Sequence, residues 1–155
     1  VIILPMSTEN MTQTVSRVLK VASAKHFQLI MPDTYFHGDK PYQTLSNSPT
    51  VADLACWEIR PDQIGKLGQV EIIRNGIVGD MQDKDPTCTY MHSWGALVFA
   101  RKLMDYALDS DPHIGYAMKT ALLSGETISA NLIKGEYFDC GTPKEYLNML
   151  REIMS

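Results

Sequence analysis

Two aspartates follow strand-like segments in settings that could hold a metal ion. Asp33 follows the apolar residues 27–31 and Pro32, and Asp139 lies in residues 135–143, shortly before a Gly-Thr-Pro sequence. The threonine can cap a helix, so a carboxylate at position 139 would lie beside helix N–H groups, where anions bind. Mg²⁺ typically takes one or two carboxylates together with substrate phosphates. These settings suit a site that holds Mg²⁺ through Asp33 and Asp139.

The alternative interpretation of both aspartates is structural. They are far apart in the sequence, so only the fold can bring them together. An aspartate that follows a strand is commonly a turn or capping residue.

The histidines and cysteines show no metal-binding pattern. We expect the four histidines (His26, His37, His92 and His113) to lie in loops or at the surface, because they have no ligand spacing. Cys140 could be a reactive thiol, but we expect it to be a small filler beside a tight turn. The three cysteines are far apart and odd in number, which favours a reduced, cytoplasmic setting over a disulfide framework.

Apolar patterns along the chain predict an α/β fold. Residues 1–4 and 27–31 resemble buried strands, and residues 15–22 between them have helical spacing, with Ser7 and Thr8 as helix caps. A strand, a helix and a strand indicate a right-handed crossover and a parallel sheet, with its functional edge at the carboxyl ends of the strands. Further strands are predicted over 51–59, 94–99 and 127–133, with a hairpin turning at Asn75-Gly76.

Three further helices are predicted. They cover residues 101–108, residues 114–124 before Gly125, and a last helix that begins in a capping box of Thr142 and Glu145. Residues 37–49 resemble a surface loop with a short helix near 42–45. Without repeats or a linker, residues 1–155 form one domain, in which helices flank a mostly parallel central sheet that carries a β-hairpin.

Composition and charge exclude some classes of function. The chain has 155 residues, of which 45% are hydrophobic and 21% charged, as in ordinary soluble globular domains. Its net charge of −4 argues against a general nucleic-acid binder, which needs a basic surface. No apolar run approaches the ~18 residues of a membrane helix.

Several segments resemble the sugar-1-phosphate nucleotidyltransferases, especially the glucose-1-phosphate thymidylyltransferase group. Residues 136–143, with the sequence EYFDCGTP, resemble the family's aromatic-Asp-x-Gly-Thr-Pro signature. Residues 27–36 resemble its strand ending in Gly-Asp-Asn, and residues 94–99 its strand that opens with a small residue and glycine. In the family, a glycine precedes a hairpin and a Glu-Lys-Pro sequence follows it. Residues 67–71, which contain a glycine, and the DKDP of residues 83–86 stand in the same order.

This resemblance implies a Rossmann-like nucleotidyltransferase fold and a specific reaction. A sugar-1-phosphate oxygen would attack the α-phosphate of a nucleoside triphosphate, forming a nucleoside-diphosphate sugar and releasing pyrophosphate. Asp33 and Asp139 would bind the Mg²⁺, Lys84 would be the catalytic lysine on the sugar phosphate, and Gly68 and Asp83 would contact the substrate. Such a transfer needs positioned charge rather than a covalent nucleophile. For Lys84 the alternative is a solvated lysine at the end of a hairpin.

The sequence also departs from the family pattern. No glycine-rich G-x-G-x-R loop occurs in it and the first residue is Val1, so we expect the nucleotide-binding amino-terminal segment to be missing and this chain alone to be inactive. Leu4 stands where relatives have a base-reading glutamine, and Asp85 separates Lys84 from Pro86. A non-catalytic homologue that binds sugar phosphate or nucleotide is the alternative, and an unrelated α/β domain is a third. The sequence does not determine which sugar and which base the protein uses, or whether it forms a homo-oligomer.

Overall fold

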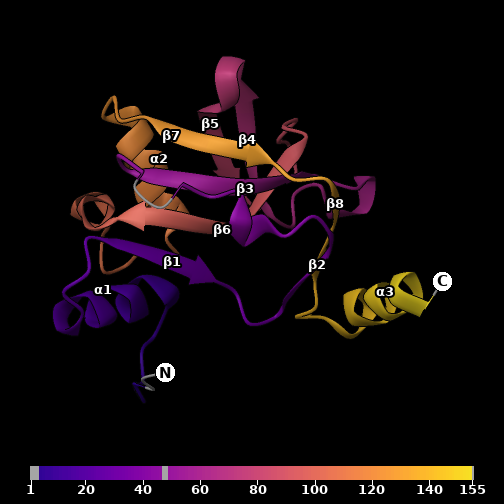
Figure 1. Cartoon of the computed structure of the whole chain (residues 1–155), viewed down its shortest axis with the longest axis horizontal. Coiled ribbons are helices and arrows are strands. Elements are labelled where there is room, and N and C mark those ends of the chain that lie inside the picture. Colours follow the sequence, from indigo (N-terminus) through magenta and orange to yellow (C-terminus); the bar gives the residue numbers. More distant parts are fainter. Residues whose placement is uncertain (1–3, 47–48, 155) are drawn as a thin grey trace.

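The computed structural model describes residues 4–46 and 49–154, and two sheets form its framework (Figure 1). The smaller sheet pairs β2 (Thr34–Gly38) with β8 (Gly135–Asp139) in antiparallel fashion. The larger sheet has six strands, which in spatial order are β1 (His26–Ile30), β6 (His92–Ala100), β3 (Ala52–Glu58), β7 (Ile128–Leu132), β5 (Ile77–Asp83) and β4 (Gly68–Ile73).

The six-stranded sheet is mixed, so the prediction of a mostly parallel sheet is wrong. Within the described residues β3 and β7 form the one parallel pair, while β6 runs antiparallel to β1, β3 and β4. The β4–β5 and β5–β7 pairs are antiparallel as well. The predicted crossover depended on a strand over residues 1–4, and residues 1–3 lie outside the described part of the chain.

In the described part of the chain, three α-helices and four short 3-10 helices complete the fold, and the strands between them largely follow the predicted apolar segments. The helices are α1 (Met11–Val21), α2 (Gly115–Leu123), α3 (Pro143–Met154), η1 (Pro41–Gln43), η2 (Pro61–Gln63), η3 (Arg74–Gly76) and η4 (Arg101–Tyr106). The helix predicted over 101–108 is therefore a shorter 3-10 helix. Asn10, rather than Ser7 or Thr8, caps α1 by accepting a hydrogen bond from the Gln13 N–H.

The predicted hairpin turn is confirmed at Asn75-Gly76. Both residues have left-handed backbone conformations, with φ angles of 62° and 68°. Two consecutive residues with positive φ are what a tight hairpin turn requires, and Asn-Gly is the residue pair that adopts them most readily. The turn fixes the register of β4 against β5, in which Gly68 lies opposite Asp83 at the open end of the hairpin.

The six-stranded sheet buries both faces, because its central strands are apolar on each side. On one face Leu54, Leu97 and Phe99 pack with apolar residues of α1, α2 and η4. On the other, Ala55 and Trp57 pack with a second cluster that includes Tyr137 of β8 and touches Phe36 of β2. Successive strand residues point to opposite faces, which explains this division. The small sheet is therefore a cover for the second face.

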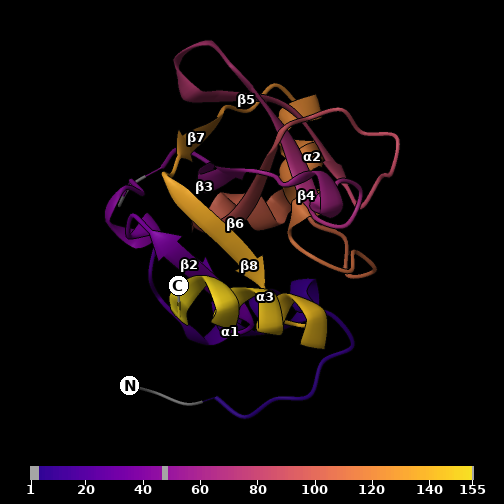
Figure 2. The same cartoon turned by 90° about the vertical axis from the view of Figure 1, so that its right-hand side faces the viewer.

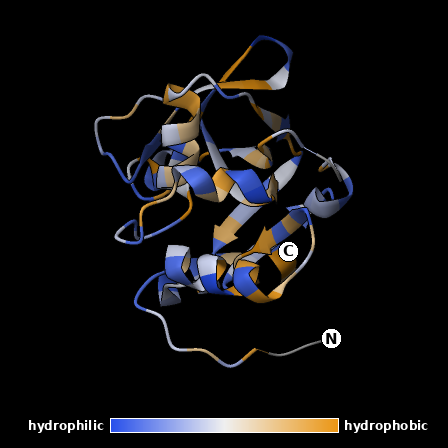
Figure 3. Cartoon of the chain, turned by 90° about the vertical axis from the view of Figure 1, so that its left-hand side faces the viewer, coloured by the Kyte–Doolittle hydropathy of each residue, from blue (hydrophilic) through white to orange (hydrophobic). Residues whose placement is uncertain are grey.

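The figures show how the small sheet lies between the larger sheet and the last helix. In Figure 2, β8 descends from the six-stranded sheet toward α3, and the chain ends at the far end of that helix. Figure 3 shows alternating hydrophilic and hydrophobic bands on the helices, as expected for helices with one buried side. Among the described residues, none of the helices combines the length and apolar character needed to cross a membrane.

Candidate active site

The small sheet brings Asp33 and Asp139 together. In the β2–β8 register Thr34 lies opposite Asp139, and the Cys140 N–H donates to the Asp33 carbonyl oxygen at 2.7 Å. A Cβ atom built on Gly141 would lie 3.0 Å from Oδ1 of Asp139 and 3.1 Å from Oδ2 of Asp33. The two carboxylates, far apart in the sequence, therefore face a common point.

The charge of this carboxylate pair has no basic partner within the described residues. Asp139 Oδ1 accepts the Gly141 N–H at 3.1 Å, and no lysine, arginine or histidine forms an ion pair with either aspartate there. Two adjacent carboxylates that lack a cation fit a divalent metal ion. No third histidine, cysteine or acidic side chain joins them in the described structure, so the remaining ligands would be substrate phosphates and water, as is usual for Mg²⁺.

The site residues that the sequence predicted all line one pocket of about 300 Å³. Asp139 ends β8 and Asp33 immediately precedes β2, whereas Gly68, Asp83 and Lys84 come from the open end of the β4–β5 hairpin. Lys66, Trp94 and His113 also contribute to the wall. The pocket thus lies between the two sheets and combines acidic groups with two lysines.

Lys84 has a strained backbone conformation within this pocket. Its φ angle of 49° lies in the left-handed region, which costs a residue with a side chain about 1 kcal/mol. The Lys84 N–H donates to the Leu67 carbonyl oxygen at 3.2 Å, which holds the residue after β5 against the start of β4. Strain of this kind is typical of functional positions, where the surrounding structure imposes it.

A second pocket of about 150 Å³ adjoins the first, and the two share Gly68, Asp83, Trp94 and His113. Asp83 does not point freely into them, because its Oδ2 lies 2.6 Å from His113 Nε2. His113 lies in the loop before α2, as expected, but its side chain lines both pockets. It precedes α2, and only the packing of α2 against the sheet brings it to Asp83.

Lys119, which lines the second pocket, is paired with a carboxylate of β5, Asp80. Asp80 binds the ammonium group of Lys119 and accepts a hydrogen bond from the Tyr90 hydroxyl at 2.7 Å. Burial opposes the ionisation of Asp80, but the hydrogen bonds from Lys119 and Tyr90 outweigh it and hold its pKa below the usual value. Its hydrogen bond to Asp80 in turn raises the pKa of Tyr90 to about 12. The charge of Lys119 in the pocket wall is therefore compensated.

Gly68 brings the backbone of β4 unusually close to Trp94 at the junction of the two pockets. A Cβ atom at position 68 would lie 2.6 Å from Trp94 Nε1, which is closer than such atoms can approach. A side chain there would displace the indole and close the junction. The absence of a side chain leaves the Gly68 backbone accessible to a ligand.

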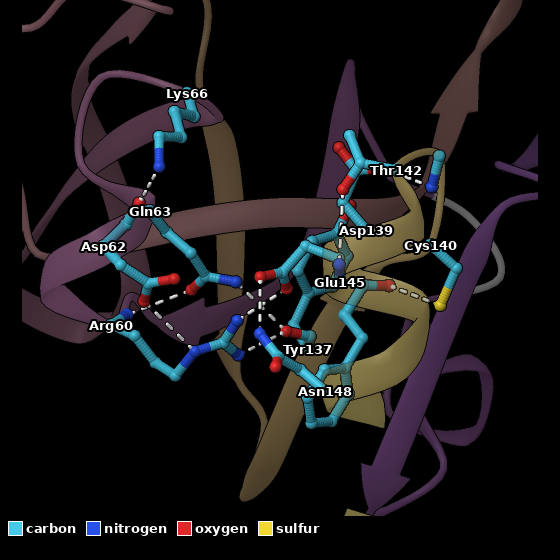
Figure 4. A network of polar contacts seen from close by, with 12 residues as sticks. Arg60, Asp62, Gln63, Lys66, Tyr137, Asp139, Cys140, Thr142, Glu145 and Asn148 are labelled. Atoms are coloured by element: carbon cyan, nitrogen blue, oxygen red, sulfur yellow. Dashed lines mark hydrogen bonds and ion pairs between the residues drawn. The ribbon is translucent and has the colours of Figure 1, made fainter. Parts of the chain in front are cut away.

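The carboxy-terminal segment that carries Asp139 is fixed by a polar network (Figure 4). Thr142 caps α3 as predicted, since its Oγ1 accepts the Glu145 N–H at 3.3 Å. The reciprocal half of the capping box is absent, because the Glu145 side chain binds Arg60 at 2.6 Å and Asn148 at 3.3 Å. Burial raises the pKa of the Cys140 thiol, and Asp139 adds to the effect, so this cysteine is a weakly reactive neighbour.

The comparisons with known proteins identify the fold. No family model and no curated protein matches the sequence. Solved structures do match: a UDP-glucose pyrophosphorylase complexed with UDP-glucose has a TM-score of 0.73 at 16% identity, covering 96% of this chain and 63% of that one. A protein described as a glucose-1-phosphate thymidylyltransferase from Bacillus anthracis, in complex with sucrose, has a TM-score of 0.74 at 16% identity, with 93% and 61% covered.

A third neighbour is a UTP-bound UGPase from Acinetobacter baumannii, with a TM-score of 0.71 and 19% identity, covering 92% of this chain and 55% of that one. The chain therefore spans between about half and two thirds of the length of these proteins. It has the nucleotidyltransferase fold that the resemblance of its sequence implied, with a mixed central sheet flanked by helices.

Proposed function

We propose that the protein is a metal-dependent sugar-1-phosphate nucleotidyltransferase, which forms a nucleoside-diphosphate sugar and pyrophosphate. The observation that carries this proposal is the arrangement of Asp33, Asp139 and Lys84 around one pocket. A pair of carboxylates without a basic partner and a nearby lysine suit the binding of a metal ion together with phosphate groups. The fold, which is that of UDP-glucose pyrophosphorylases and a thymidylyltransferase, supports the same proposal.

The proposed chemistry depends on positioned charge. Mg²⁺, held by Asp33 and Asp139, would neutralise the oxygens of the phosphates that react. Lys84 would bind the sugar phosphate, whose oxygen attacks the α-phosphate while pyrophosphate leaves. No side chain needs to act as a covalent nucleophile, because phosphoryl-type transfer is accelerated mainly by orientation and by stabilisation of negative charge.

The second pocket would receive the sugar ring of the substrate. Its volume of about 150 Å³ and its aromatic and polar wall suit one monosaccharide, and it opens into the phosphate pocket at Gly68. The Asp83–His113 pair can exchange hydrogen bonds with hydroxyl groups, and the Gly68 backbone is accessible beside it. Because Asp83 is hydrogen-bonded to His113 and Lys119 is paired with Asp80, this part of the cleft suits an uncharged ring.

The test is an assay for pyrophosphate release with a panel of sugar-1-phosphates and nucleoside triphosphates. It compares the product of the complete coding sequence with the 155-residue chain, each with Mg²⁺ and with a chelator. We expect metal-dependent turnover of at least one substrate pair by the complete product. The chain alone should give none, because no G-x-G-x-R loop occurs in its 155 residues.

Two outcomes would contradict this proposal in different ways. Binding of a sugar phosphate by calorimetry, without pyrophosphate release from any pair, would favour the non-catalytic homologue. Turnover that persists undiminished in the presence of the chelator would remove the metal from the mechanism.

A further inference from the structure

Arg60 lies at the junction of the two sheets, where its side chain contacts four residues (Figure 4). It follows the end of β3 and begins η2. Its Nη1 donates to the Tyr137 carbonyl oxygen at 3.0 Å, and its Nη2 binds Glu145 at 2.6 Å. The guanidinium carbon also lies 5.1 Å from the centre of the Phe138 ring, and Nε lies 3.4 Å from Asp62.

The two strongest contacts of Arg60 are placed on either side of Asp139. Tyr137 precedes Asp139 on β8, and Glu145 lies in the first turn of α3 beyond the turn at Gly141. Gln63, which is buried, donates a second hydrogen bond to the Tyr137 carbonyl oxygen at 3.2 Å. The turn that carries Asp139 is therefore held at both ends by the segment that follows β3.

The same segment reaches the lysine side of the pocket. The Gly65 N–H donates to Gln69 Oε1 at 2.8 Å, which ties the segment to β4. Two residues later, the Leu67 carbonyl oxygen accepts the Lys84 N–H at 3.2 Å. Residues 60–69 thus connect the aspartate of one sheet with the lysine of the other, and Arg60 is the end that holds Asp139.

We propose that Arg60 is a positioning residue, which sets the location of Asp139 relative to Asp33 and Lys84 and so determines how well the site holds its metal ion. This role rests on the proposed function. A guanidinium suits it because its planar fork donates in two directions, here to a carbonyl and to a carboxylate, whereas a lysine ammonium is a single point charge. Partners that orient metal ligands typically change metal affinity by about 10- to 100-fold when removed.

Arg101 provides a matched control at the opposite end of the sheet. Its guanidinium donates to the carbonyl oxygens of Leu19, at 2.7 Å, and of Ala22 and Ala24, and it lies 5.3 Å from the centre of the Phe27 ring. It therefore has the same structural role of tying segments together beside an aromatic ring, but it lines neither of the two site pockets. Replacement of Arg101 should reduce stability without affecting metal binding.

The experiment is a Mn²⁺ titration followed by electron paramagnetic resonance, with Mn²⁺ alone as the probe and the complete coding-sequence product as the protein. Arg60→Met should raise the dissociation constant about tenfold, in the range typical of such partners. Arg60→Lys, which keeps the charge but not the fork, should give an intermediate value and carries the test if Arg60→Met does not fold. Arg101→Met should bind Mn²⁺ like the wild type, although its melting temperature falls.

Asp139→Asn separates failure of this inference from failure of the proposed function. If Asp139→Asn weakens Mn²⁺ binding while both Arg60 variants match the wild type, Arg60 is only a structural link and the inference is overturned. If none of the variants changes Mn²⁺ binding, Asp139→Asn included, the proposed metal site itself is wrong and the role of Arg60 falls with it.

Discussion

Two groups of carboxylates, on β5 and at the small sheet, differ in whether a basic side chain is paired with them. On β5, Asp80 and Asp83 are each paired with a basic side chain, Lys119 and His113. On the small sheet, Asp33 and Asp139 face a common point without such a partner in the described residues. A compensated carboxylate can present hydrogen bonds to an uncharged ligand, whereas adjacent uncompensated carboxylates need an external cation.

The first prediction tests this difference directly and has the largest expected effect. Asp139→Asn keeps the size of the side chain and its acceptor for the Gly141 N–H, but removes the charge that would hold the metal. We expect turnover to fall a hundredfold or more, about 2.7 kcal/mol of barrier. The denaturation midpoint should change little.

Asp80→Asn is the matched change in the other region. It should leave the Mg²⁺ dependence of turnover unaltered. It should also lower the free energy of unfolding by less than about 1 kcal/mol, because the Asp80–Lys119 pair is partly exposed. Equal losses of turnover in the two variants would remove the distinction between the regions.

The second prediction separates strain from charge at Lys84. Lys84→Gly relieves the left-handed conformation and should stabilise the fold by about 1 kcal/mol. It also removes the ammonium group, worth about 2 kcal/mol as a hydrogen bond to a charged ligand, so kcat/KM should fall about thirtyfold. Asn75→Gly is the control, since Asn75 also has a positive φ but lies at the distant hairpin turn. A Lys84→Gly variant with unchanged kcat/KM would indicate a merely solvated lysine.

The third prediction concerns the compensated side of the cleft. His113→Gln replaces the imidazole that lies 2.6 Å from Asp83 Oδ2, and we expect KM for the sugar-1-phosphate to rise about tenfold, or about 1.4 kcal/mol. The Mg²⁺ concentration that gives half-maximal rate should stay at the wild-type value, because His113 is paired with Asp83 and with neither of the proposed metal ligands. Steady-state kinetics at varied concentrations of sugar phosphate and of Mg²⁺ distinguish the two effects. A change in the half-maximal Mg²⁺ concentration with an unaltered KM for the sugar phosphate would contradict the assignment of this pocket to the sugar.

The fourth prediction is a stability effect without a comparable catalytic one. Thr142→Ala removes the cap of α3 and should cost about 1 kcal/mol of the free energy of unfolding. Turnover should fall by much less than in Asp139→Asn, because Arg60 and Gln63 still hold the preceding strand. Chemical denaturation and the pyrophosphate assay measure the two quantities, and a large loss of turnover at full stability would assign Thr142 to the site.

Local sequence patterns predicted most of the elements that carry the site. The Asn75-Gly76 hairpin, the strand now seen as β3 and the Thr142 cap depend on residues close together in the chain, and each is present. The resemblance to nucleotidyltransferases predicted which distant residues would meet, and Asp33, Asp139, Gly68, Asp83 and Lys84 do line one pocket. Their functional roles stay predictions.

The features that the sequence did not predict depend on tertiary contacts. The antiparallel pairing of β1 with β6 has no local signal, and so a strand-helix-strand pattern suggested a parallel sheet. His113 and Arg60 have ordinary neighbours in the chain, and their importance comes from Asp83 and Glu145, which the fold brings from elsewhere. The predicted capping by the Glu145 side chain fails for the same reason: this side chain binds the charged guanidinium of Arg60 instead, which is a stronger hydrogen-bond donor than a backbone N–H.

The most direct test of the central claim is to locate the metal itself. Crystals of the complete coding-sequence product, grown with Mn²⁺, would be measured at the manganese absorption edge for anomalous diffraction. We expect a single site between Asp33 and Asp139, with at least one carboxylate oxygen at ~2.1–2.2 Å from the metal and the other carboxylate bound directly or through one water. A site that neither aspartate contacts, or carboxylates that turn away from each other with no metal between them, would contradict it.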